Sequence, residues 1–410
     1  MMKTRRAQVW LVALLIGYAA WLPAGARPQQ PETAPFAVTH GPYLQLPATT
    51  SMTIVWHTNR PAVSRVEYGP TDALGLTAIV SRHGLIDNGR TSHIIRLEGL
   101  KPGTAYRYRV VSRGFAGYEK QHIVKYGATV SSDILSFTTL AASSPAWSFP
   151  VVSDIHENAK RLDALLARVD WSRTRFAVFN GDMVNDFMNL DQPFSGFIDT
   201  AVARFAQTIP FVYVRGNHDV RGRYARRLAE YFPLSPAGDR AYYSFDHGGV
   251  HVIVLDSGED KVDTHEYYNG LVAFEAYRRE QAAWLAADLS SPAARSARYR
   301  VVVSHIPPYE GPPRAAAPGA APREEGFAIT QVRERWEKAA NAGRVDLWLS
   351  GHTHRYAHVA PAPGKNAYHL VIGAPDTFAR VDVSPQRLVV TTTKETGETV
   401  GTVTIQRKSP

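Results

Sequence analysis

Several chemistries are excluded by what this sequence lacks. None of its 410 residues is cysteine, which excludes a disulfide framework, an iron–sulfur cluster, a thiolate zinc site and a cysteine nucleophile. The sequence also has no Gly-x-Ser-x-Gly turn, no P-loop and no Gly-x-Gly-x-x-Gly motif, so serine hydrolases, nucleotide kinases and dinucleotide enzymes lack their signatures. Any metal site must therefore use His, Asp, Asn or Glu side chains.

Long uncharged apolar runs are scarce, and the one that occurs lies near the N-terminus. Residues 7–20 carry no charge; they follow Lys3, Arg5 and Arg6 and precede the small residues Ala24-Gly25-Ala26. This order is typical of a secretory signal peptide, and the run is shorter than the about 20 residues of a membrane-spanning helix. We therefore predict a signal peptide over residues 1–26, a linker over residues 27–35 and a protein that is exported, periplasmic or secreted. A retained membrane anchor is the alternative.

Length and composition indicate a folded protein of two domains. At 44% hydrophobic and 20% charged residues the chain has enough apolar surface to form a core, and 410 residues exceed what one core usually organises.

Removal of Lys3, Arg5 and Arg6 would change the formal net charge from +9 to +6. This basic balance favours anionic small-molecule substrates. No arginine-rich tract supports nucleic acid as a structural partner, no other segment is suited to span a membrane, and the oligomeric state is left open.

Short alternating strands separated by turn residues characterise residues 36–140. The predicted strands cover residues 52–58, 64–68, 92–97, 106–112 and 134–138. This spacing is typical of a β-sandwich. The segment from Leu100 to Tyr106 resembles the tyrosine corner of fibronectin type III domains, in which the phenol forms a hydrogen bond with the upstream backbone. We therefore expect a fibronectin III-like domain over residues 36–140.

After a Ser/Pro/Ala-rich joint at residues 141–146, apolar runs alternate with helical patterns. Strands are predicted at residues 149–152, 176–179, 211–214, 250–255, 300–303, 346–349 and 368–372. Amphipathic helices are predicted at residues 162–169, 274–285 and 332–340. This alternation predicts a layered α/β domain over residues 147–380, completed by C-terminal strands in residues 381–410. Residues 257–270 and 309–327 are predicted to be loops.

Nearly every predicted strand of this second domain ends in a side chain that can bind a metal ion. The clusters after the strands are Asp154-Ile-His156, Asn180-Gly-Asp182, Gly216-Asn-His-Asp219, Ser304-His305 and Gly351-His-Thr-His354. Because ligands bind beyond the carboxyl ends of the strands in open α/β sheets, we expect these clusters to meet at one edge. Two carboxylates, one amide and four imidazoles suit a pair of ions such as zinc, iron or manganese. Asp182 suits the position between the two ions.

A pair of ions about 3.5 to 4 Å apart lowers the pKa of a shared water and stabilises charge on a displaced ester oxygen. The glycines beside the ligands permit the backbone to turn sharply without a clash at Cβ. This chemistry favours hydrolysis of phosphoesters.

In their order and residue types, these five motifs resemble the signature of the calcineurin-like metallophosphoesterases. Together with the fibronectin-like domain before them, the chain resembles the purple acid phosphatases and their bacterial relatives. The resemblance covers residues 36–375. It implies an N-terminal β-sandwich followed by a metallophosphoesterase domain built as a layered β-sandwich flanked by helices, with the activity of a metal-dependent phosphoric ester hydrolase.

Carried over residue by residue, the resemblance implies the following roles. One ion would be held by Asp154, His156 and His354, the other by Asn217, His305 and His352, with Asp182 between them. His218 would lie beside the phosphate, donate a hydrogen bond and protonate the leaving oxygen. Asp219 would orient that imidazole or a neighbour, and a helix cap is the alternative.

The sequence departs from the purple pattern in three places. His156 stands where that subgroup has glycine, Asn185 stands where it has the tyrosine that gives the colour, and Asp219 stands where glutamate is more usual. Without a phenolate on ferric iron, the protein should be colourless or pale, and the identity of the metals stays open between iron, zinc and manganese.

The function expected from the sequence is that of an exported phosphatase with two metal ions that hydrolyses phosphomonoesters through an activated hydroxide. A phosphodiesterase or nucleotide-cleaving enzyme is the alternative, since the same metals hydrolyse either ester. A binding or adhesive module with a vestigial metal site is the alternative from another class, but all seven ligands are present. Several polar residues are left between a role in phosphate binding and a structural one: Arg221, Arg223, His265, Arg355 and Tyr356. His251 alternates with apolar neighbours and is expected to be a satisfied or a solvent-side strand residue.

Overall fold

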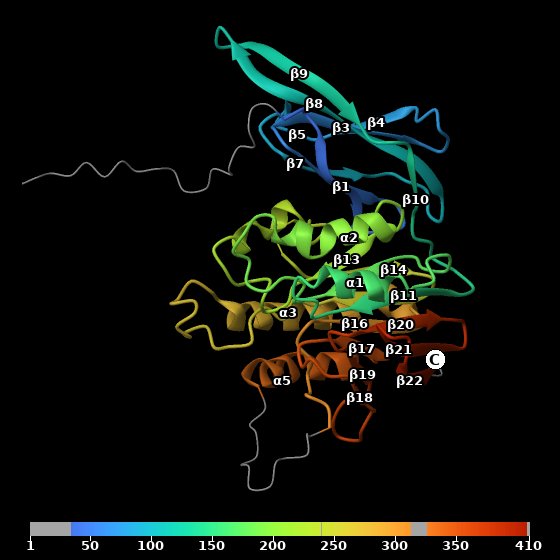
Figure 1. Cartoon of the computed structure of the whole chain (residues 1–410). Helices are drawn as coiled ribbons and strands as arrows, with labels where there is room; N and C mark the ends of the chain where they lie inside the picture. Colours follow the sequence, from blue (N-terminus) through green and yellow to red (C-terminus); the bar gives the residue numbers. More distant parts are fainter. Residues whose placement is uncertain (1–33, 239, 313–325, 408–410) are drawn as a thin grey trace, which may run out of the picture. The chain divides into compact units, whose positions relative to one another are not determined.

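The computed structural model describes residues 34–238, 240–312 and 326–407 (Figure 1). The predicted signal peptide, almost all of the predicted linker and most of the predicted loop at residues 309–327 lie outside these ranges. Within them, no helix has both the length and the apolar character needed to cross a bilayer.

The N-terminal part of the described chain consists of β-strands. Its strands are β1 (Val38–Gln45), β2 (Met52–Thr58), β3 (Ala62–Gly69), β4 (Leu76–Ile79), β5 (Ser81–Arg82), β6 (Leu85–Ile86), β7 (Ser92–Leu97), β8 (Ala105–Glu119), β9 (Ile123–Ser131) and β10 (Leu135–Thr138). Strands β1, β2 and β7 are hydrogen-bonded in one sheet, and β10, β8, β3 and β4 in another, with β9 paired to β8. All five predicted strands are present, whereas β1, β4, β5, β6 and β9 were not predicted.

The two sheets enclose an apolar core, as expected for a β-sandwich. Side chains from both sheets meet in this core, among them Trp56 on β2 and Tyr108 on β8, which are fully buried. The phenol oxygen of Tyr106 accepts a hydrogen bond from the backbone N–H of Lys101 at 3.0 Å. The tyrosine corner expected from the sequence is therefore confirmed.

One sheet of the sandwich continues into the sheet that follows. Strand β1 pairs in parallel with β13 (Phe211–Val214) through Gln45 and Phe211, so β1, β2 and β7 extend a nine-stranded sheet. Tyr43 donates a hydrogen bond to the carbonyl of Tyr231 at 2.7 Å, and Tyr108 donates one to the carbonyl of Gln207 at 2.7 Å. This strand pairing and these hydrogen bonds connect the two predicted domains.

The remaining strands and helices alternate, as expected for an α/β domain. The strands are β11 (Trp147–Val152), β12 (Ala177–Asn180), β13, β14 (Tyr243–His247), β15 (Val250–Val254), β16 (Tyr299–Val303), β17 (Leu347–Ser350), β18 (Ala357–Val359), β19 (His369–Ile372), β20 (Thr377–Val383), β21 (Arg387–Lys394) and β22 (Thr399–Gln406). The helices are α1 (Ala159–Leu166), η1 (Phe194–Ile198), α2 (Asp199–Ala201), η2 (Val202–Ala206), η3 (Ala225–Glu230), α3 (Phe274–Leu289), α4 (Pro292–Ser296) and α5 (Phe327–Ala342). The helical segment from η1 to η2 was not predicted.

Two sheets pack face to face, and helices cover their outer faces. The nine-stranded sheet has the order β22-β21-β20-β11-β12-β13-β1-β2-β7, and a six-stranded sheet has the order β14-β15-β16-β17-β19-β18. Val151 and Val178 of the first sheet share one apolar core with Val301 and Leu349 of the second. Helix α1 packs on the outer face of the first sheet, and α3 and α5 pack on the outer face of the second. The metallophosphoesterase-type layering expected from the sequence is confirmed.

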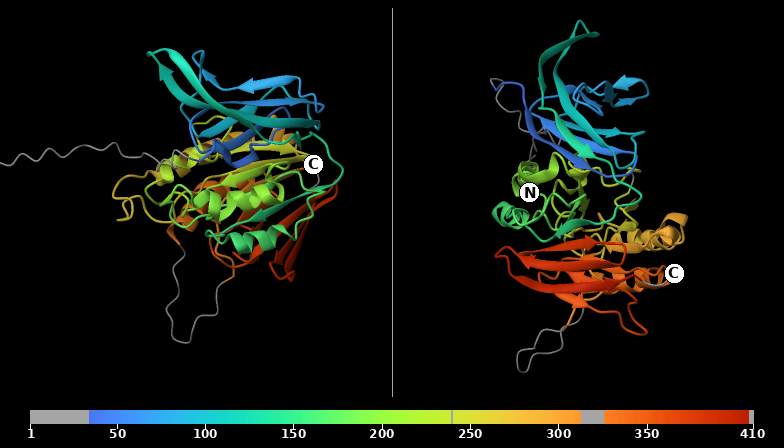
Figure 2. Two further views of the ribbon diagram at one scale, coloured as in Figure 1. Left: turned by 45° about the horizontal axis from the view of Figure 1, so that its top comes forward. Right: turned by 90° about the vertical axis from the view of Figure 1, so that its right-hand side faces the viewer.

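The last three strands form an antiparallel ribbon beside β11. Strand β20 pairs with β11 from Trp147↔Val383 to Val151↔Ala379, and β21 and β22 follow as its neighbours. Figure 2 shows this ribbon in red. Because it occupies the edge beyond β11, the strand that precedes Asp154 is an interior strand of the sheet.

An ion pair between His251 and Asp288 links the six-stranded sheet to helix α3. His251 on β15 is 2% exposed, and its ring nitrogens lie 2.8 Å from Asp246 on β14 and 2.9 Å from Asp288 on α3. Burial lowers the pKa of this imidazole, but the hydrogen bonds to Asp246 and Asp288 outweigh burial and raise the pKa to about 9. Of the two alternatives left for His251, the satisfied strand residue is correct.

This ion pair predicts a pH dependence of stability. Because the folded-state pKa is raised above the unfolded value, the stabilisation is complete below about pH 6.5 and is lost as the pH rises to about 9. The free energy of unfolding should fall across this window by up to about 3 kcal/mol more in the wild type than in His251→Gln. Urea unfolding at pH 6 and pH 9 measures this difference, and equal pH dependence in the two proteins would contradict the prediction.

Candidate metal centre

The polar clusters follow strands whose carboxyl ends point the same way. Strands β11, β12 and β13 are parallel and precede Asp154, Asp182 and Asn217, whereas the parallel strands β16 and β17 precede His305 and His352. The clusters were expected at the edge of one sheet. They come instead from two sheets packed face to face, three from the nine-stranded sheet and two from the six-stranded sheet. The site therefore lies where the carboxyl ends of both sheets meet.

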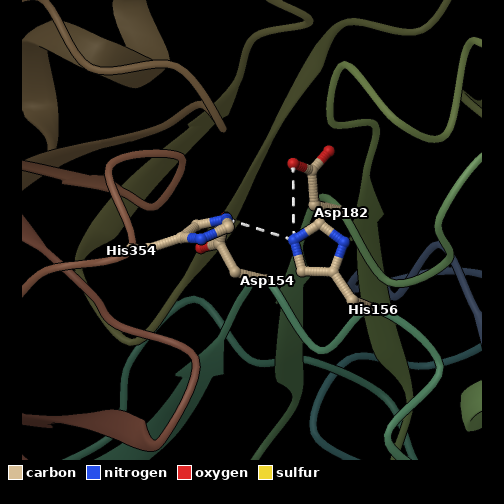
Figure 3. A group of neighbouring side chains, drawn as sticks. All are labelled: Asp154, His156, Asp182 and His354. Atoms are coloured by element: carbon tan, nitrogen blue, oxygen red, sulfur yellow. Dashed lines mark hydrogen bonds and ion pairs between the residues drawn. The ribbon is translucent and has the colours of Figure 1, made fainter.

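Four side chains form a first donor group (Figure 3). Its members, each with one ligand atom within 4.8 Å of the others, are Asp154, His156, Asp182 and His354. The Nε2 atoms of His156 and His354 lie 3.1 Å apart. His354 Nε2 is 3.3 Å from Asp154 Oδ1, and His156 Nε2 is 4.0 Å from Asp182 Oδ2. The carboxylates are buried, whereas the side chain of His354 is half exposed, so the group is accessible from one side.

A second donor group consists of Asp182, His305 and His352. His305 Nε2 lies 3.1 Å from Asp182 Oδ2, and the Oδ1 atom of Asn217 lies 2.9 Å from His352 Nδ1. The other ring nitrogen of His305 is 2.8 Å from the carbonyl oxygen of Asn180. Since a carbonyl only accepts, Nδ1 donates to Asn180, and Nε2 is the ring nitrogen directed at the centre.

Asp182 is common to both donor groups. Its Oδ2 atom faces His305, and its Oδ1 atom accepts a hydrogen bond from the backbone N–H of His218 at 2.9 Å. Six of the seven expected ligands belong to these two groups, and the seventh, Asn217, contacts His352 of the second group. Carboxylate, amide and imidazole donors without a thiolate fit iron, zinc or manganese. The residues present thus fit a pair of ions.

The backbone is strained where it presents these side chains. Five of the seven expected ligands have φ angles between 49° and 70°: Asp154, His156, Asp182, His352 and His354. This left-handed conformation costs a non-glycine residue on the order of 1 kcal/mol and is typical of functional sites. Two glycines allow the loops to approach closely, because a Cβ atom at Gly216 would overlap Asp182 and one at Gly351 would collide with Asp154. The expected role of these glycines is confirmed.

The site concentrates charge in a buried volume. Burial opposes the charged forms of both His305 and Asp182, but their mutual attraction is stronger, so the pKa of His305 is raised to about 10 and that of Asp182 is lowered. Burial and the neighbouring His305 lower the pKa of His352 to about 4. The ion pair therefore favours the protonated form of His305 and the ionised form of Asp182, whereas His352 is held neutral, so a cation that binds at Nε2 of His305 must displace its proton.

His218 lies beside the first donor group. Its ring is 4.9 Å from that of His156, measured between centroids. Its Nδ1 atom is 3.3 Å from a carboxylate oxygen of Asp186, and its Nε2 atom is 3.4 Å from Nη1 of Arg221. Asp186 was not singled out in the sequence, although it lies only four residues beyond Asp182.

The buried side chain of Asp219 binds backbone groups of two loops. Its side chain is fully buried, and its Oδ2 atom accepts hydrogen bonds from the backbone N–H groups of Gly216 and Asp182 at 2.7 and 2.9 Å. Its Oδ1 atom accepts one from Val184 at 3.3 Å. Asp219 therefore connects the loop of Asn217 to the loop of Asp182; it forms no hydrogen bond with the His218 ring and does not begin a helix.

Other polar residues around the centre were missed or left open. Glu157, which follows His156 directly, accepts hydrogen bonds from the backbone of Asn185 and from Gln192, both at 2.8 Å. Asn185 itself donates to the carbonyl of His156 at 3.4 Å. No motif marks these residues, because their roles depend on which loops lie side by side.

Of the residues left open, Arg221 lies beside His218, and His265 contacts the ring of Tyr267. Arg355 donates a hydrogen bond to the carbonyl of Glu310 at 3.2 Å, and Tyr356 packs against the core between the two sheets.

A sequence profile of the calcineurin-like phosphoesterases matches residues 149–356, and a profile of the N-terminal domain of purple acid phosphatases matches residues 40–139. Purple acid phosphatase 21 of Arabidopsis thaliana is 25% identical over 293 residues, which cover 68% of this chain and 56% of that protein. Acid phosphatase type 7 of Mus musculus is 26% identical over 227 residues, which cover 52% of this chain and 47% of that protein. The chain thus spans about half the length of these relatives.

Solved structures of the same fold are also found. The purple acid phosphatase PPD1 from seeds of yellow lupin (Lupinus luteus) aligns with a TM-score of 0.66 at 16% identity and covers 90% of this chain and 74% of that one. A structure described as PhoD aligns with a TM-score of 0.57 at 14% identity and covers 89% of this chain and 92% of that one. At these identities the likeness shows a shared fold.

Proposed function

Because the chain belongs to the calcineurin-like phosphoesterase family, we propose that it hydrolyses phosphomonoesters at a centre of two metal ions. The observation that carries this proposal is the division of the donor atoms into two groups that share Asp182. A carboxylate common to two cation sites offsets the repulsion between the cations.

The residues have distinct roles in this proposal. One ion would be held by Asp154, His156 and His354, the other by Asn217, His305 and His352, and both by Asp182. Iron, zinc and manganese all suit this donor set. Such ions, when bound, supply positive charge for the developing oxyanions and lower the pKa of bound water. The protein contributes the positions of the donors through the Asn180 carbonyl at His305 and through the backbone amides fixed by Asp219.

His218 would move a proton to the leaving oxygen. Its backbone N–H is fixed by Asp182, and its Nδ1 atom faces Asp186, so Nε2 is the ring nitrogen that remains for the substrate. Arg221 approaches Nε2 at 3.4 Å, which is a long contact that a substrate oxygen can replace. Asp186 thereby acts as a positioning residue for the imidazole.

Chelation combined with a substrate panel tests the proposed function. Phosphate release from phenyl phosphate should be lost after treatment with a chelator and restored by added iron, zinc or manganese. Rates on bis(4-nitrophenyl) phosphate distinguish the diesterase alternative, because a preference above about tenfold for the diester would assign the enzyme to that class. Full activity in the metal-free protein would refute the proposal.

Replacing Asp186 tests the role of His218. The Asp186→Ala variant should lower kcat by about tenfold to hundredfold on alkyl phosphates, with less effect on 4-nitrophenyl phosphate, because only poor leaving groups depend strongly on protonation. Asp191→Ala removes an exposed carboxylate from the same segment and is the matched control. Equal losses on both substrates would mean that Asp186 acts on structure and not on proton transfer.

The identity of residue 185 leads to a prediction of the colour of the protein. Asn185 occupies the position of the colour-giving tyrosine and holds the His156 loop by donating to the His156 carbonyl. With no phenolate at this position, the purified protein loaded with metals should be colourless or pale. A visible absorption spectrum measures this, and a strong band of the tyrosinate-to-iron type would contradict the prediction.

We also propose that the protein is exported after removal of residues 1–26. The support is the sequence pattern of Lys3, Arg5 and Arg6, an apolar stretch and a small-residue cleavage site. N-terminal sequencing of the mature protein tests this, with Arg27 as the expected first residue.

A further inference from the structure

Two short segments with exposed apolar side chains lie next to Arg221, beside the proposed catalytic centre. In the described chain beyond residue 140, the large apolar side chains that are exposed fall in two short segments: Met188, Val262, Tyr267 and Leu271. The two segments lie on either side of Arg221. The backbone of Phe187 donates a hydrogen bond to the carbonyl of Arg221 at 2.9 Å, and the Tyr267 ring lies 5.9 Å from the Arg221 guanidinium. Among these residues, Tyr267 presents an exposed aromatic ring next to Arg221.

A short series of contacts connects Tyr267 to the centre. Its ring lies next to Arg221, Nη1 of Arg221 lies 3.4 Å from Nε2 of His218, and the His218 ring packs against the ring of His156. A phosphate ester held at the donor groups would therefore direct its leaving group past His218 toward Tyr267. The tyrosine is 63% exposed in spite of its charged neighbours, so most of its surface is available to a ligand.

The loop that presents Tyr267 is held in place by helix α3. Arg278 on this helix is fully buried and donates hydrogen bonds to the carbonyls of Ser257, at 2.8 Å, and Glu259. The carboxylate of Asp263 accepts hydrogen bonds from the backbone of Phe274 and Glu275, at 2.9 and 3.1 Å, where α3 begins. A ring on a loop fixed in this way loses little conformational entropy when a ligand binds.

The charges around the ring disfavour a second phosphate. Arg221 donates to Glu259 at 2.8 Å and to Asp260 at 2.7 Å, and Lys261 donates to Asp260 at 2.7 Å. Two cations and two carboxylates give this cluster no net charge. The group that contacts Tyr267 should therefore be uncharged and flat, because a tyrosine ring binds such groups by stacking.

We propose that Tyr267 is a stacking platform for an aromatic ring in the leaving group. The preferred substrates are then phosphomonoesters of phenols or of nucleosides, and not polyphosphates or simple alkyl phosphates. This inference rests on the proposed function and specifies its substrate class.

Matched substrates test the platform. Adenosine 5′-monophosphate and ribose 5-phosphate differ only by the base, and phenyl phosphate represents the phenolic esters. In Tyr267→Ala, kcat/KM for the nucleotide should fall about tenfold or more, with ribose 5-phosphate unchanged, whereas Tyr267→Phe should retain the wild-type preference. If kcat/KM for phenyl phosphate falls in the same way, the substrate class includes phenolic esters. If it is unchanged, the substrate class is restricted to esters of nucleosides. Tyr118→Ala is the control, since Tyr118 is an equally exposed tyrosine (57%) on β8.

Two outcomes in Tyr267→Ala would overturn the inference. In one, kcat/KM changes equally for adenosine 5′-monophosphate and ribose 5-phosphate; in the other, kcat/KM changes neither for the nucleotide nor for phenyl phosphate. Calorimetric titration with adenosine 5′-monophosphate gives a readout that does not require turnover, and its Kd should rise about tenfold in Tyr267→Ala. If the wild type cleaves none of these esters, the proposed function fails, and the titration alone decides whether Tyr267 binds the ring. An equal Kd in both proteins rejects the platform.

Discussion

Replacing Asp182 by asparagine is expected to lower kcat/KM for phosphomonoesters by at least about a thousandfold, which corresponds to about 4 kcal/mol. Asp182 is the only residue that belongs to both donor groups in the part of the chain that the structure describes. The change keeps the size of the side chain and an oxygen that can accept from the His218 amide. It removes the negative charge between two cation sites, so metal binding should weaken at both.

Elemental analysis and steady-state kinetics together check this prediction. The wild type should contain two metal ions per chain, and Asp182→Asn should contain fewer than two after the same purification. Asp191→Asn, an exposed carboxylate outside the centre, should leave metal content and rate unchanged. Two tightly bound ions and wild-type turnover in Asp182→Asn would falsify the assignment of Asp182 as the shared ligand.

Replacing Asp219 by alanine should affect stability and metal binding together. The carboxylate accepts hydrogen bonds from the backbone N–H groups of Gly216, Asp182 and Val184, and its removal leaves three donors without this partner. Each buried donor that loses its partner costs about 1–3 kcal/mol, so the free energy of unfolding should fall by about 3 kcal/mol or more. Metal affinity should fall by about tenfold to hundredfold, because the Asp182 loop is no longer fixed.

The asparagine variant provides the control for Asp219. One oxygen of Asp219→Asn still accepts from Gly216 and Asp182, and only the contact with Val184 is lost. Its stability and metal affinity should therefore lie between those of the wild type and Asp219→Ala. Urea unfolding and metal titration measure both quantities. A wild-type unfolding midpoint in Asp219→Ala would rule out the proposed connection between the two loops.

The predictions for Asp182 and Asp219 differ in how far the sequence alone identifies the residue. Asp182 is recognisable because a glycine and a carboxylate follow a run of apolar residues, and a glycine followed by a metal-ligating residue recurs at Asn217 and His352. Asp219 was noticed only because it is adjacent to His218. Its partners Asp182 and Val184 are more than thirty residues away in the sequence. No local sequence pattern indicates that their backbone N–H groups donate to Asp219.

The same distinction holds for the fold. The strands at residues 52–58, 92–97 and 211–214 agree with β2, β7 and β13, because each is a short apolar or alternating run bounded by turn residues. Strand β1 was missed because it contains Gly41 and Pro42, which usually interrupt strands. Its pairing with β13, which joins the sandwich to the following sheet, depends on residues more than 160 positions apart.

The sequence by itself determined the chemical types of the ligands, their positions after strands and the order of the two architectures, because strand periodicity and the polarity change at a strand end are local properties. Only the tertiary structure decided that the ligands come from two packed sheets and that Asp219 connects two loops. It also decided that Arg278 holds the loop that presents Tyr267 beside Arg221. These contacts join residues from separate elements, and they depend on how the sheets and helices pack, which no short stretch of sequence specifies.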